Sequence, residues 1–200
     1  MTLENVTRGF GLLESFLSMK RIKIAKNIIG KYNVKNGRIL DIGCGSYPFF
    51  LVNVNFDEKY GLDNEIYDQY FKYQNLRLVE YDIGSDLPFE DNYFEVITLL
   101  AVVEHLYTNQ MYKILTNCYS LLKKNGILIV TTPARWSNII LKLMVKMGLV
   151  SSEEVGEHKY TYNLRELRDI LLGMNFKRKD IYGGYFEFFL NLWIYAIKRR

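Results

Sequence analysis

The sequence predicts an α/β domain built on a doubly wound, seven-stranded and mostly parallel sheet whose last strand runs antiparallel. Strand-like and helix-like segments alternate along most of the chain, as they do in parallel sheets covered by helices on both faces. The segment 94–100 is rich in Val, Ile and Leu without polar alternation, which is typical of a central strand buried on both sides. Several predicted strands end in aspartate, and doubly wound sheets bind ligands beyond the carboxyl ends of their strands. We therefore expect the site at that edge of the sheet.

Size and composition favour a single domain. The chain has 200 residues, of which 49% are hydrophobic, enough for one sizeable core. We expect four consecutive parts: an N-terminal helical cover at 1–36, a ligand-binding core at 37–134, an insertion or lid at 135–162, and a closing helix with strands at 163–200.

The N-terminal half begins with an amphipathic helix. Apolar residues recur at helical spacing from Gly9 to about Lys31, with lysine and arginine between them. Asn36-Gly37 marks a turn before the first strand. The predicted elements that follow are a strand at 38–42, a short helix at 48–54, a strand at 59–63, a helical stretch to about Tyr73, a strand at 76–81 and the central strand at 94–100.

The C-terminal half continues the alternation and adds a helical insertion. A helix at 108–122 is expected to stop at Lys124-Asn125-Gly126, before a strand at 127–132. An apolar helix at 137–147 and an acidic loop at 151–157 predict an insertion over the strand ends after the fifth strand. A helix at 164–173 and two closing strands, at about 176–181 and 190–198, complete the sheet.

Cysteine use and hydropathy favour a cytoplasmic protein. Cys44 and Cys118 are too few for a disulfide framework and have no metal-ligand spacing, so no metal is expected. The most apolar tail segment, 185–197, is interrupted by Glu187 and Asn191 and is too short to span a membrane. The N-terminus shows no basic-then-apolar signal pattern.

Charge is distributed unevenly along the chain. Residues 1–36 carry 7 basic and 2 acidic groups, and residues 135–200 carry 12 basic and 7 acidic groups. The middle, 37–134, carries 7 basic and 13 acidic groups. If the basic flanks cover the strand ends, they favour an acceptor that bears phosphate or carboxylate. Solvated lysine-rich faces explain the pattern equally well.

The loop after the first strand carries the strongest chemical signal. A dinucleotide site needs a third glycine and a helix N-terminus for pyrophosphate, but Gly43-Cys44-Gly45 has no third glycine. Asp41 stands at the loop entrance, where a carboxylate is unfavourable beside phosphates. The same carboxylate suits a cofactor with a cationic sulfonium and an ammonium group, such as S-adenosylmethionine (SAM).

With this loop the sequence resembles the class I SAM-dependent methyltransferases, especially their small-molecule (methyltransferase type 11-like) group. The matching motifs are Leu40-Asp41-Ile42-Gly43-Cys44-Gly45, the acids that end the second and third strands, the segment 99–104, and the 121–126 turn, in which Lys124 and Asn125 replace the family's proline and one glycine. The resemblance covers about residues 38–134 and extends loosely to 198. It implies a Rossmann-like sheet and methyl transfer from SAM, with S-adenosylhomocysteine as product.

The resemblance also assigns cofactor contacts. The glycine loop is expected to approach the methionine part of SAM, the acid at the end of the second strand to accept the ribose hydroxyls, and the third strand end to flank the adenine. The residues so implied are Asp41, Gly43, Cys44, Gly45, Asp63, Asn64, Asp82, Ile83, Leu100 and His105. Cys44 is interpreted as a small apolar filler rather than a nucleophile, because no basic residue lies beside it in sequence.

The resemblance implies two candidate catalytic residues just after the fourth strand. His105 occupies the position that faces the transferred methyl group, and a neutral imidazole can accept a hydroxyl proton near neutral pH. It is the candidate general base; the alternative is that it caps the next helix or lines the cofactor pocket. Glu104 either orients His105 or closes the adenosine site.

Four further residues are candidates for the acceptor pocket. Arg135 and Trp136 follow the fifth strand at the position of the pocket rim in the family, where they can meet an anionic or ring-bearing acceptor. A core position for Trp136 is the alternative. His158 and Tyr160 match a His-then-Tyr feature that precedes a helix in small-molecule members, and a structural cap started by Asn163 explains the same pattern.

The acceptor itself is not identified by the sequence, and several partner classes stay open. A small hydroxyl-bearing acceptor that carries phosphate or carboxylate, such as a nucleotide-linked sugar or other glycan precursor, a lipid head group or another metabolite, is the leading hypothesis. Peripheral membrane or protein association through the helix at 138–147 and the N-terminal helix is an alternative. A SAM-binding protein without transferase activity and an RNA methyltransferase are further alternatives. Nucleic acid is disfavoured, because strand four ends in Leu100-Ala101-Val102-Val103 without the Asn/Asp-Pro-Pro-aromatic motif of adenine amino methylases, and no Pro-Cys pair is present.

Overall fold

The computed structural model describes residues 12–34, 36–66, 73–82, 85–137, 160–187 and 189–200, with side chains from Ser18 onward. The sheet strands are β1 (Arg38–Ile42), β2 (Glu58–Asp63), β3 (Leu76–Glu80), β4 (Phe94–Leu100), β5 (Leu122–Pro133), β6 (Ile181–Phe186) and β7 (Asn191–Ile197). The helices are α1 (Leu12–Lys31), α2 (Phe49–Val52), α3 (Thr108–Leu121) and α6 (Leu164–Gly173), with short 3-10 turns η2 (Val103–His105) and η3 (Arg178–Asp180).

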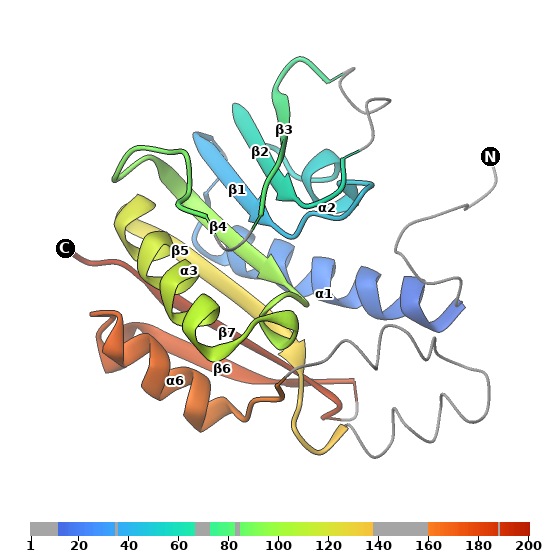
Figure 1. Ribbon diagram of the computed structural model, residues 1–200, viewed down its shortest axis with the longest axis vertical. Helices are drawn as coiled ribbons and strands as arrows, with labels where there is room; N and C mark the ends of the chain where they lie inside the picture. The colour runs from blue at the N-terminus through green and yellow to red at the C-terminus, as the bar shows by residue number, and fades with distance from the viewer. Residues whose placement is uncertain (1–11, 35, 67–72, 83–84, 138–159, 188) are drawn as a thin grey trace.

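The strands form one seven-stranded sheet in the order β3-β2-β1-β4-β5-β7-β6 (Figure 1). β1 pairs in parallel with both β2 and β4, and β7 runs antiparallel to both of its neighbours, β5 and β6. The predicted mostly parallel, doubly wound sheet with an antiparallel last strand is confirmed, as is the N-terminal helix from Leu12 onward. The expected helical insertion lies outside the described residues, at 138–159, and so does most of the helical stretch before β3, at 67–72.

The antiparallel pairing of β7 divides the C-terminal segments between the two edges of the sheet. Asn191 pairs with Pro133 at the carboxyl end of β5, and Ile197 pairs with Ile127 near its beginning. The β6–β7 connection therefore lies at the carboxyl edge, and Lys198–Arg200 lie at the amino edge. η3 precedes Ile181, which pairs with Ala196, so η3 lies at the amino edge as well.

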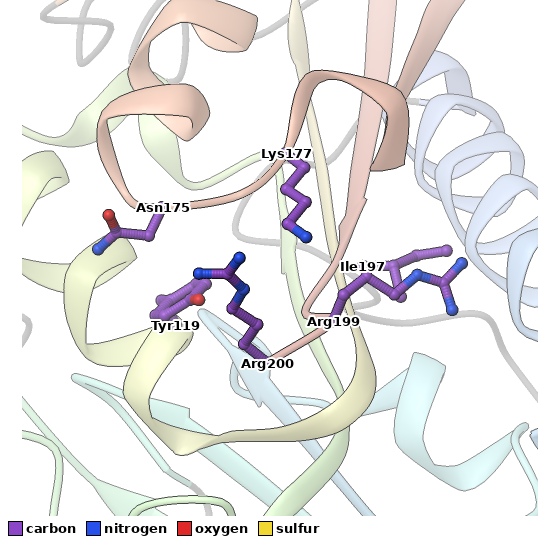
Figure 2. A pocket seen from close by; sticks show the side chains of 6 residues that line it. All are labelled: Tyr119, Asn175, Lys177, Ile197, Arg199 and Arg200. Atoms are coloured by element: carbon purple, nitrogen blue, oxygen red, sulfur yellow. The ribbon is translucent and has the colours of Figure 1, made fainter.

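A cavity of about 370 Å³ occupies this amino edge, away from the strand ends that carry the motif residues (Figure 2). Its lining residues are Tyr119, Asn175, Lys177, Ile197, Arg199 and Arg200. The last cations of the chain therefore lie away from the carboxyl ends of the strands. Pairing of β7 with β5 carries them to the opposite edge, where Arg199 pairs with Asp180 at 3.0 Å.

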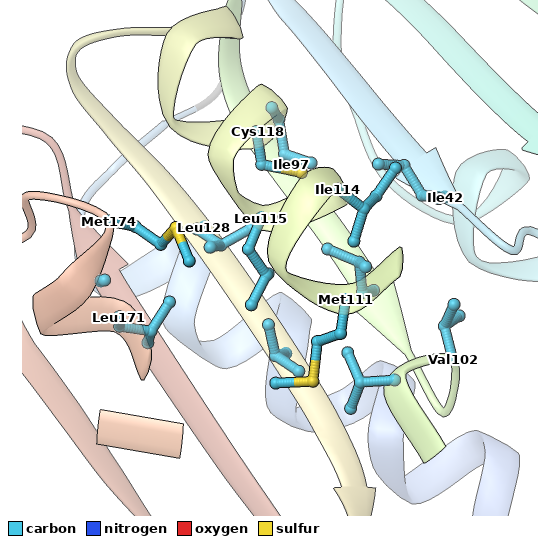
Figure 3. Close-up of a cluster of buried hydrophobic side chains, with 14 of the residues drawn as sticks. Ile42, Ile97, Val102, Met111, Ile114, Leu115, Cys118, Leu128, Leu171 and Met174 are labelled. Carbon is cyan, nitrogen blue, oxygen red and sulfur yellow. The ribbon is translucent and has the colours of Figure 1, made fainter. Parts of the chain in front are cut away.

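The core lies on both faces of the sheet. α3 and α6 cover one face, where Met111, Ile114 and Leu115 of α3 point at the sheet and Leu171 of α6 packs beside them (Figure 3). α1 and α2 cover the other face with a second cluster that includes Ile22, Ala25, Ile28, Ile29, Phe50 and Leu51. One face of α1 and one face of α3 pack on the sheet, and for this reason apolar residues recur at helical spacing in both segments.

Two predicted boundaries are wrong. The helix predicted at 108–122 ends at Leu121, and the strand predicted at 127–132 already begins at Leu122, which pairs with Phe94. The side chain of Leu122 is fully buried, which favours its place in the sheet. Asn125, with φ +67°, bends the strand rather than ending the helix. The closing strand predicted at 176–181 is found at 181–186, because Phe176 packs in the core and the 3-10 turn holding the buried Asp180 intervenes.

Candidate active site

The loops after β1 and β4 meet at the centre of the carboxyl edge. The chain leaves β1 toward β2 on one side and continues from β4 toward β5 on the other, so β1 and β4 flank the topological switch point. Gly43 follows β1 with φ +74°, and a Cβ built on it would lie 2.4 Å from Cγ2 of Val102, which follows β4. Glycine is required here because of both the positive φ and the close approach.

The glycine loop is tied to β2 and leaves one side open. The N–H groups of Gly43 and Cys44 donate to the carbonyl of Leu62 at 2.7 and 3.1 Å. Gly45 has φ +75°, and the nearest atom to a Cβ built on it is the carbonyl oxygen of Tyr47, 3.8 Å away. A ligand can therefore approach the backbone at Gly45 closely.

Asp63 links the end of β2 to this loop. Its Oδ2 accepts a hydrogen bond from the Gly45 N–H at 2.8 Å, and its Oδ1 accepts a longer one from the Glu65 N–H at 3.4 Å. Asn64 is exposed next to it. Asp82 is exposed just after β3, so the ends of three adjacent strands present acidic side chains, whereas Ile83 lies outside the described residues.

Asp41 is the buried acid of the group. Its side chain is 3% exposed, and Thr98 of β4 donates a hydrogen bond to its Oδ1. Burial is the largest cause that raises the pKa of Asp41 to about 7; the Thr98 hydrogen bond opposes this shift, and the negative charge of Asp63 adds to it. A cation bound beside the loop would lower this pKa again, because it favours the ionised carboxylate.

Cys44 supports the loop from below. Its side chain is buried, and its Sγ would lie 2.8 Å from a Cβ on Gly61 of β2. Burial raises the pKa of the Cys44 thiol, which keeps it protonated. The side chain therefore fills space between the loop and β2.

The end of β4 leads directly into the candidate catalytic residues. Leu100 ends the strand, Ala101 adopts φ +61°, and the chain then enters η2. Glu104 is 1% exposed, and its Oε2 has no hydrogen-bond partner among the described residues. Burial raises the pKa of Glu104, whereas the charges of His105 and Arg21 lower it. His105 is half-buried at the end of η2.

The candidate acceptor residues lie near the carboxyl end of β5, with different partners. The Tyr160 N–H donates to the carbonyl of Glu104 at 3.2 Å, which brings Tyr160 to η2. Arg135 forms an ion pair with Glu166 of α6 at 2.7 Å, so its guanidinium already has a structural partner. Trp136 is 42% exposed, which excludes the alternative of a core position. His158 lies outside the described residues.

Ala101 and Val102, which approach the glycine loop, belong to the 99–104 segment that carries a motif. Several other residues of this edge had no signal in the sequence: Thr98 donates to Asp41, Arg21, Thr132 and Tyr162 interact with Glu104, and Glu187 interacts with Arg21. They come from distant segments, so only an accurate strand order would have indicated them.

The described part of the chain holds no group of three or more His, Cys, Asp or Glu side chains arranged to bind a metal. Among its helices, none has both the length and the apolar character to cross a membrane.

The sheet order, with its switch point between β1 and β4, is that of the Rossmann-like SAM-dependent methyltransferases. Residues 17–178 match the family model described as "Methyltransferase domain". The chain therefore belongs to the methyltransferase-domain family and is a class I SAM-dependent methyltransferase. No curated protein matches the chain.

Solved structures with the same fold include three that align over most of this chain. A SAM-dependent methyltransferase from Archaeoglobus fulgidus has a TM-score of 0.63 at 18% identity, covering 88% of this chain and 94% of that chain. The YcgJ protein from Bacillus subtilis has a TM-score of 0.66 at 14% identity, covering 91% and 99%. Phosphoethanolamine N-methyltransferase 2 from Haemonchus contortus, solved with SAM, has a TM-score of 0.66 at 16% identity, covering 90% of this chain and 52% of that chain. At these identities the likeness shows the fold alone.

Proposed function

We propose that this chain binds SAM in the crevice between β1 and β4 and transfers its methyl group to a small hydroxyl-bearing acceptor. The observation that carries the proposal is the row of acids at the ends of three adjacent strands, Asp41, Asp63 and Asp82, beside a glycine loop that is open at Gly45. SAM carries two positive charges at its methionine end and no phosphate, which suits carboxylates better than a nucleotide pyrophosphate does.

Each part of the crevice suits one part of the cofactor. Gly43 and Gly45 let the backbone approach the methionine end, and the ionised form of Asp41 stabilises its positive charges. Asp63 already accepts from Gly45, and it keeps lone pairs for the ribose hydroxyls. Asp82 and Ile83 are proposed to flank the adenine, with Asn64 and Leu100 completing the pocket.

Methyl transfer is an in-line displacement, so the main task of the protein is to hold the acceptor oxygen in line with the methyl group. When bound, SAM supplies the electrophilic methyl group. His105 follows the β4 end, and we propose that its imidazole would take the proton of the acceptor hydroxyl while the O–C bond forms, the sulfur–methyl bond breaks and S-adenosylhomocysteine leaves. Glu104 precedes it, and the charge of His105 lowers the pKa of Glu104, so the two side chains lie within electrostatic reach of each other.

Calorimetric titration with S-adenosylhomocysteine tests the cofactor site. Wild type should bind at micromolar strength, and Asp63→Ala should weaken binding at least tenfold, because a charge-assisted hydrogen bond contributes about 1.5–3 kcal/mol. Asp169→Ala, which changes an exposed acid on α6, is the matched control and should bind as wild type does. A folded wild type that fails to bind would require the proposal to be withdrawn.

A further inference from the structure

The carboxyl edge beyond β4 and β5 holds a concentration of buried polar atoms without partners. Among the described residues, five such atoms belong to this region: Arg21 Nε, Glu104 Oε2, Thr132 Oγ1, Tyr162 OH and Glu187 Oε1. An unsatisfied buried polar atom costs about 1–3 kcal/mol. Folded proteins rarely leave several together, so the concentration indicates a place that a polar ligand satisfies.

These five residues converge from separate segments. Thr132 is near the end of β5, Tyr162 is bridged to Ala134 just beyond that end, and Glu187 lies in the connection between β6 and β7. Arg21 comes from α1, and its charge lowers the pKa of both Glu104 and Glu187, so both carboxylates lie within its electrostatic reach. The Thr132 hydroxyl also lowers the pKa of Glu104, although neither Glu104 Oε2 nor Thr132 Oγ1 forms a well-oriented hydrogen bond.

The chemistry of this polar cluster favours hydroxyl groups. Carboxylate oxygens only accept hydrogen bonds, Arg21 Nε–H only donates, and threonine and tyrosine hydroxyls do both. A ligand hydroxyl can satisfy all three kinds of group, because it donates and accepts at once. A phosphate group is negatively charged, and two carboxylates beside it would repel that charge. The cluster therefore matches a polyhydroxylated group better than an anion.

Exposed aromatic rings lie at the same end of the sheet. Trp136 contacts Tyr185 with ring centroids 4.8 Å apart, and Tyr185 contacts Phe189 at 6.1 Å. Trp136 is 42% exposed and Phe189 is 65% exposed. Tyr185 and Phe189 flank Glu187 in sequence, so the aromatic surface borders one carboxylate of the polar cluster. Small-molecule sites combine such apolar walls with a few convergent polar groups.

We propose that the polar cluster and the aromatic surface together bind a hexose-type sugar ring with free hydroxyls, which is the methyl acceptor. Glu104 and Glu187 accept from ring hydroxyls, Arg21 and Thr132 donate to them, and the rings of Trp136 and Phe189 cover an apolar face of the sugar. One hydroxyl is thereby placed next to His105. This inference rests on the proposed function, because it names the acceptor class of the same site.

Tryptophan fluorescence provides a direct test, because the chain has only two tryptophans. In a Trp193→Phe variant saturated with S-adenosylhomocysteine, Trp136 reports on the acceptor side alone. Methyl hexopyranosides of different configuration and nucleoside-diphosphate hexoses are titrated separately, to distinguish a glycan end from an activated sugar. At least one of them should change the emission saturably, and inorganic phosphate and free UDP should not.

Matched variants then test the assigned groups. Glu104→Gln and Glu187→Gln should each weaken sugar binding about tenfold or more, and Phe189→Ala should weaken it several-fold. Tyr73→Ala, which removes an exposed ring before the start of β3, should have no effect. Circular dichroism and thermal unfolding show that each variant is folded, and Glu187→Gln, Phe189→Ala and Tyr73→Ala should also keep wild-type affinity for S-adenosylhomocysteine.

Two outcomes would overturn the sugar proposal while the proposed function stands. One is that S-adenosylhomocysteine binds but no hexoside changes Trp136 emission, and the other is that phosphate or UDP binds as tightly as the sugars. Failure to bind S-adenosylhomocysteine would instead remove the proposed function itself.

Discussion

Gly43 and Val102 are packed so closely that the loop after β1 has no room for a Cβ, which would lie 2.4 Å from Val102 Cγ2. The contact joins the two strands that flank the switch point, and it depends on Ala101, whose φ of +61° turns the chain back under the loop. A left-handed non-glycine residue costs about 1–2 kcal/mol, so the rest of the edge must hold Ala101 in place. The crevice is thus formed by two loops that position each other.

Gly43→Ala is expected to lower the free energy of unfolding by about 2–4 kcal/mol, because the added Cβ clashes with Val102 and the backbone keeps a positive φ that alanine disfavours. Val102→Ala should cost about 1–2 kcal/mol by itself. In the double variant the clash is absent, so the two losses should fall short of additivity by at least about 1 kcal/mol. Urea unfolding of the four proteins measures this coupling, and simple additivity would show that the two residues do not position each other.

Asp41→Asn is expected to make the protein more stable at pH 8 by on the order of 2–4 kcal/mol, because the native pKa of Asp41 is raised to about 7 from 3.8. Between about pH 4 and pH 7 the native state holds a proton that the unfolded chain has lost, so this carboxyl lowers stability as pH rises through that window. The stability of the Asp41→Asn variant should not fall in this way as the pH rises, because asparagine does not titrate. Equal pH dependence of unfolding in both proteins would contradict the raised pKa.

SAM affinity is expected to rise with pH through about 7, because only the ionised Asp41 attracts the sulfonium and ammonium groups. S-adenosylhomocysteine lacks the sulfonium charge, so its affinity should change less over the same range. Calorimetry of both ligands from pH 5.5 to 8.5 compares them. The Asp41→Asn variant is the control, and a rise that persists in it would assign the effect to another group.

His105→Gln is expected to lower turnover about 100-fold or more and to change the affinity for S-adenosylhomocysteine less than threefold, because a general base acts on the chemical step. Turnover is measured with the acceptor found in the sugar titrations, in the presence of saturating SAM. If turnover and cofactor affinity fall by the same factor, His105 lines the cofactor pocket and is not the base.

Lys198→Met is expected to destabilise the protein by about 2–4 kcal/mol, because the ammonium group is buried and its hydrogen bonds are charge-assisted. Its Nζ donates to the carbonyls of Leu122 and Ser120 at 2.7 and 3.1 Å and to Asn92 Oδ1 at 3.0 Å, which anchors the end of β7 to the start of β5. Burial lowers the pKa of Lys198. Thermal unfolding measures the effect, and Lys124→Met, which changes an exposed lysine, is the control. If both variants lose the same small amount of stability, the hydrogen bonds of Lys198 are not needed to hold β7.

The sequence by itself determined the central part of this protein. β4 and α6 were predicted with the bounds that the structure shows, because burial on both faces of β4 and a capping Asn163 before α6 are local patterns. The glycine loop and the acids Asp41, Asp63 and Asp82 were found in the same way, since their spacing follows the strands. Ile83 and His158 stay predictions.

Only the tertiary structure decided what lies across the sheet. The bounds of β6 depend on the buried Asp180 and its pairing with Arg199, and the basic tail lies at the amino edge because β7 pairs antiparallel with β5. Arg21, Glu104 and Glu187 are far apart in the chain and meet only because α1, η2 and the β6–β7 connection share the carboxyl edge. Local patterns report which side of an element is buried, whereas contacts between distant residues depend on how the strands are ordered.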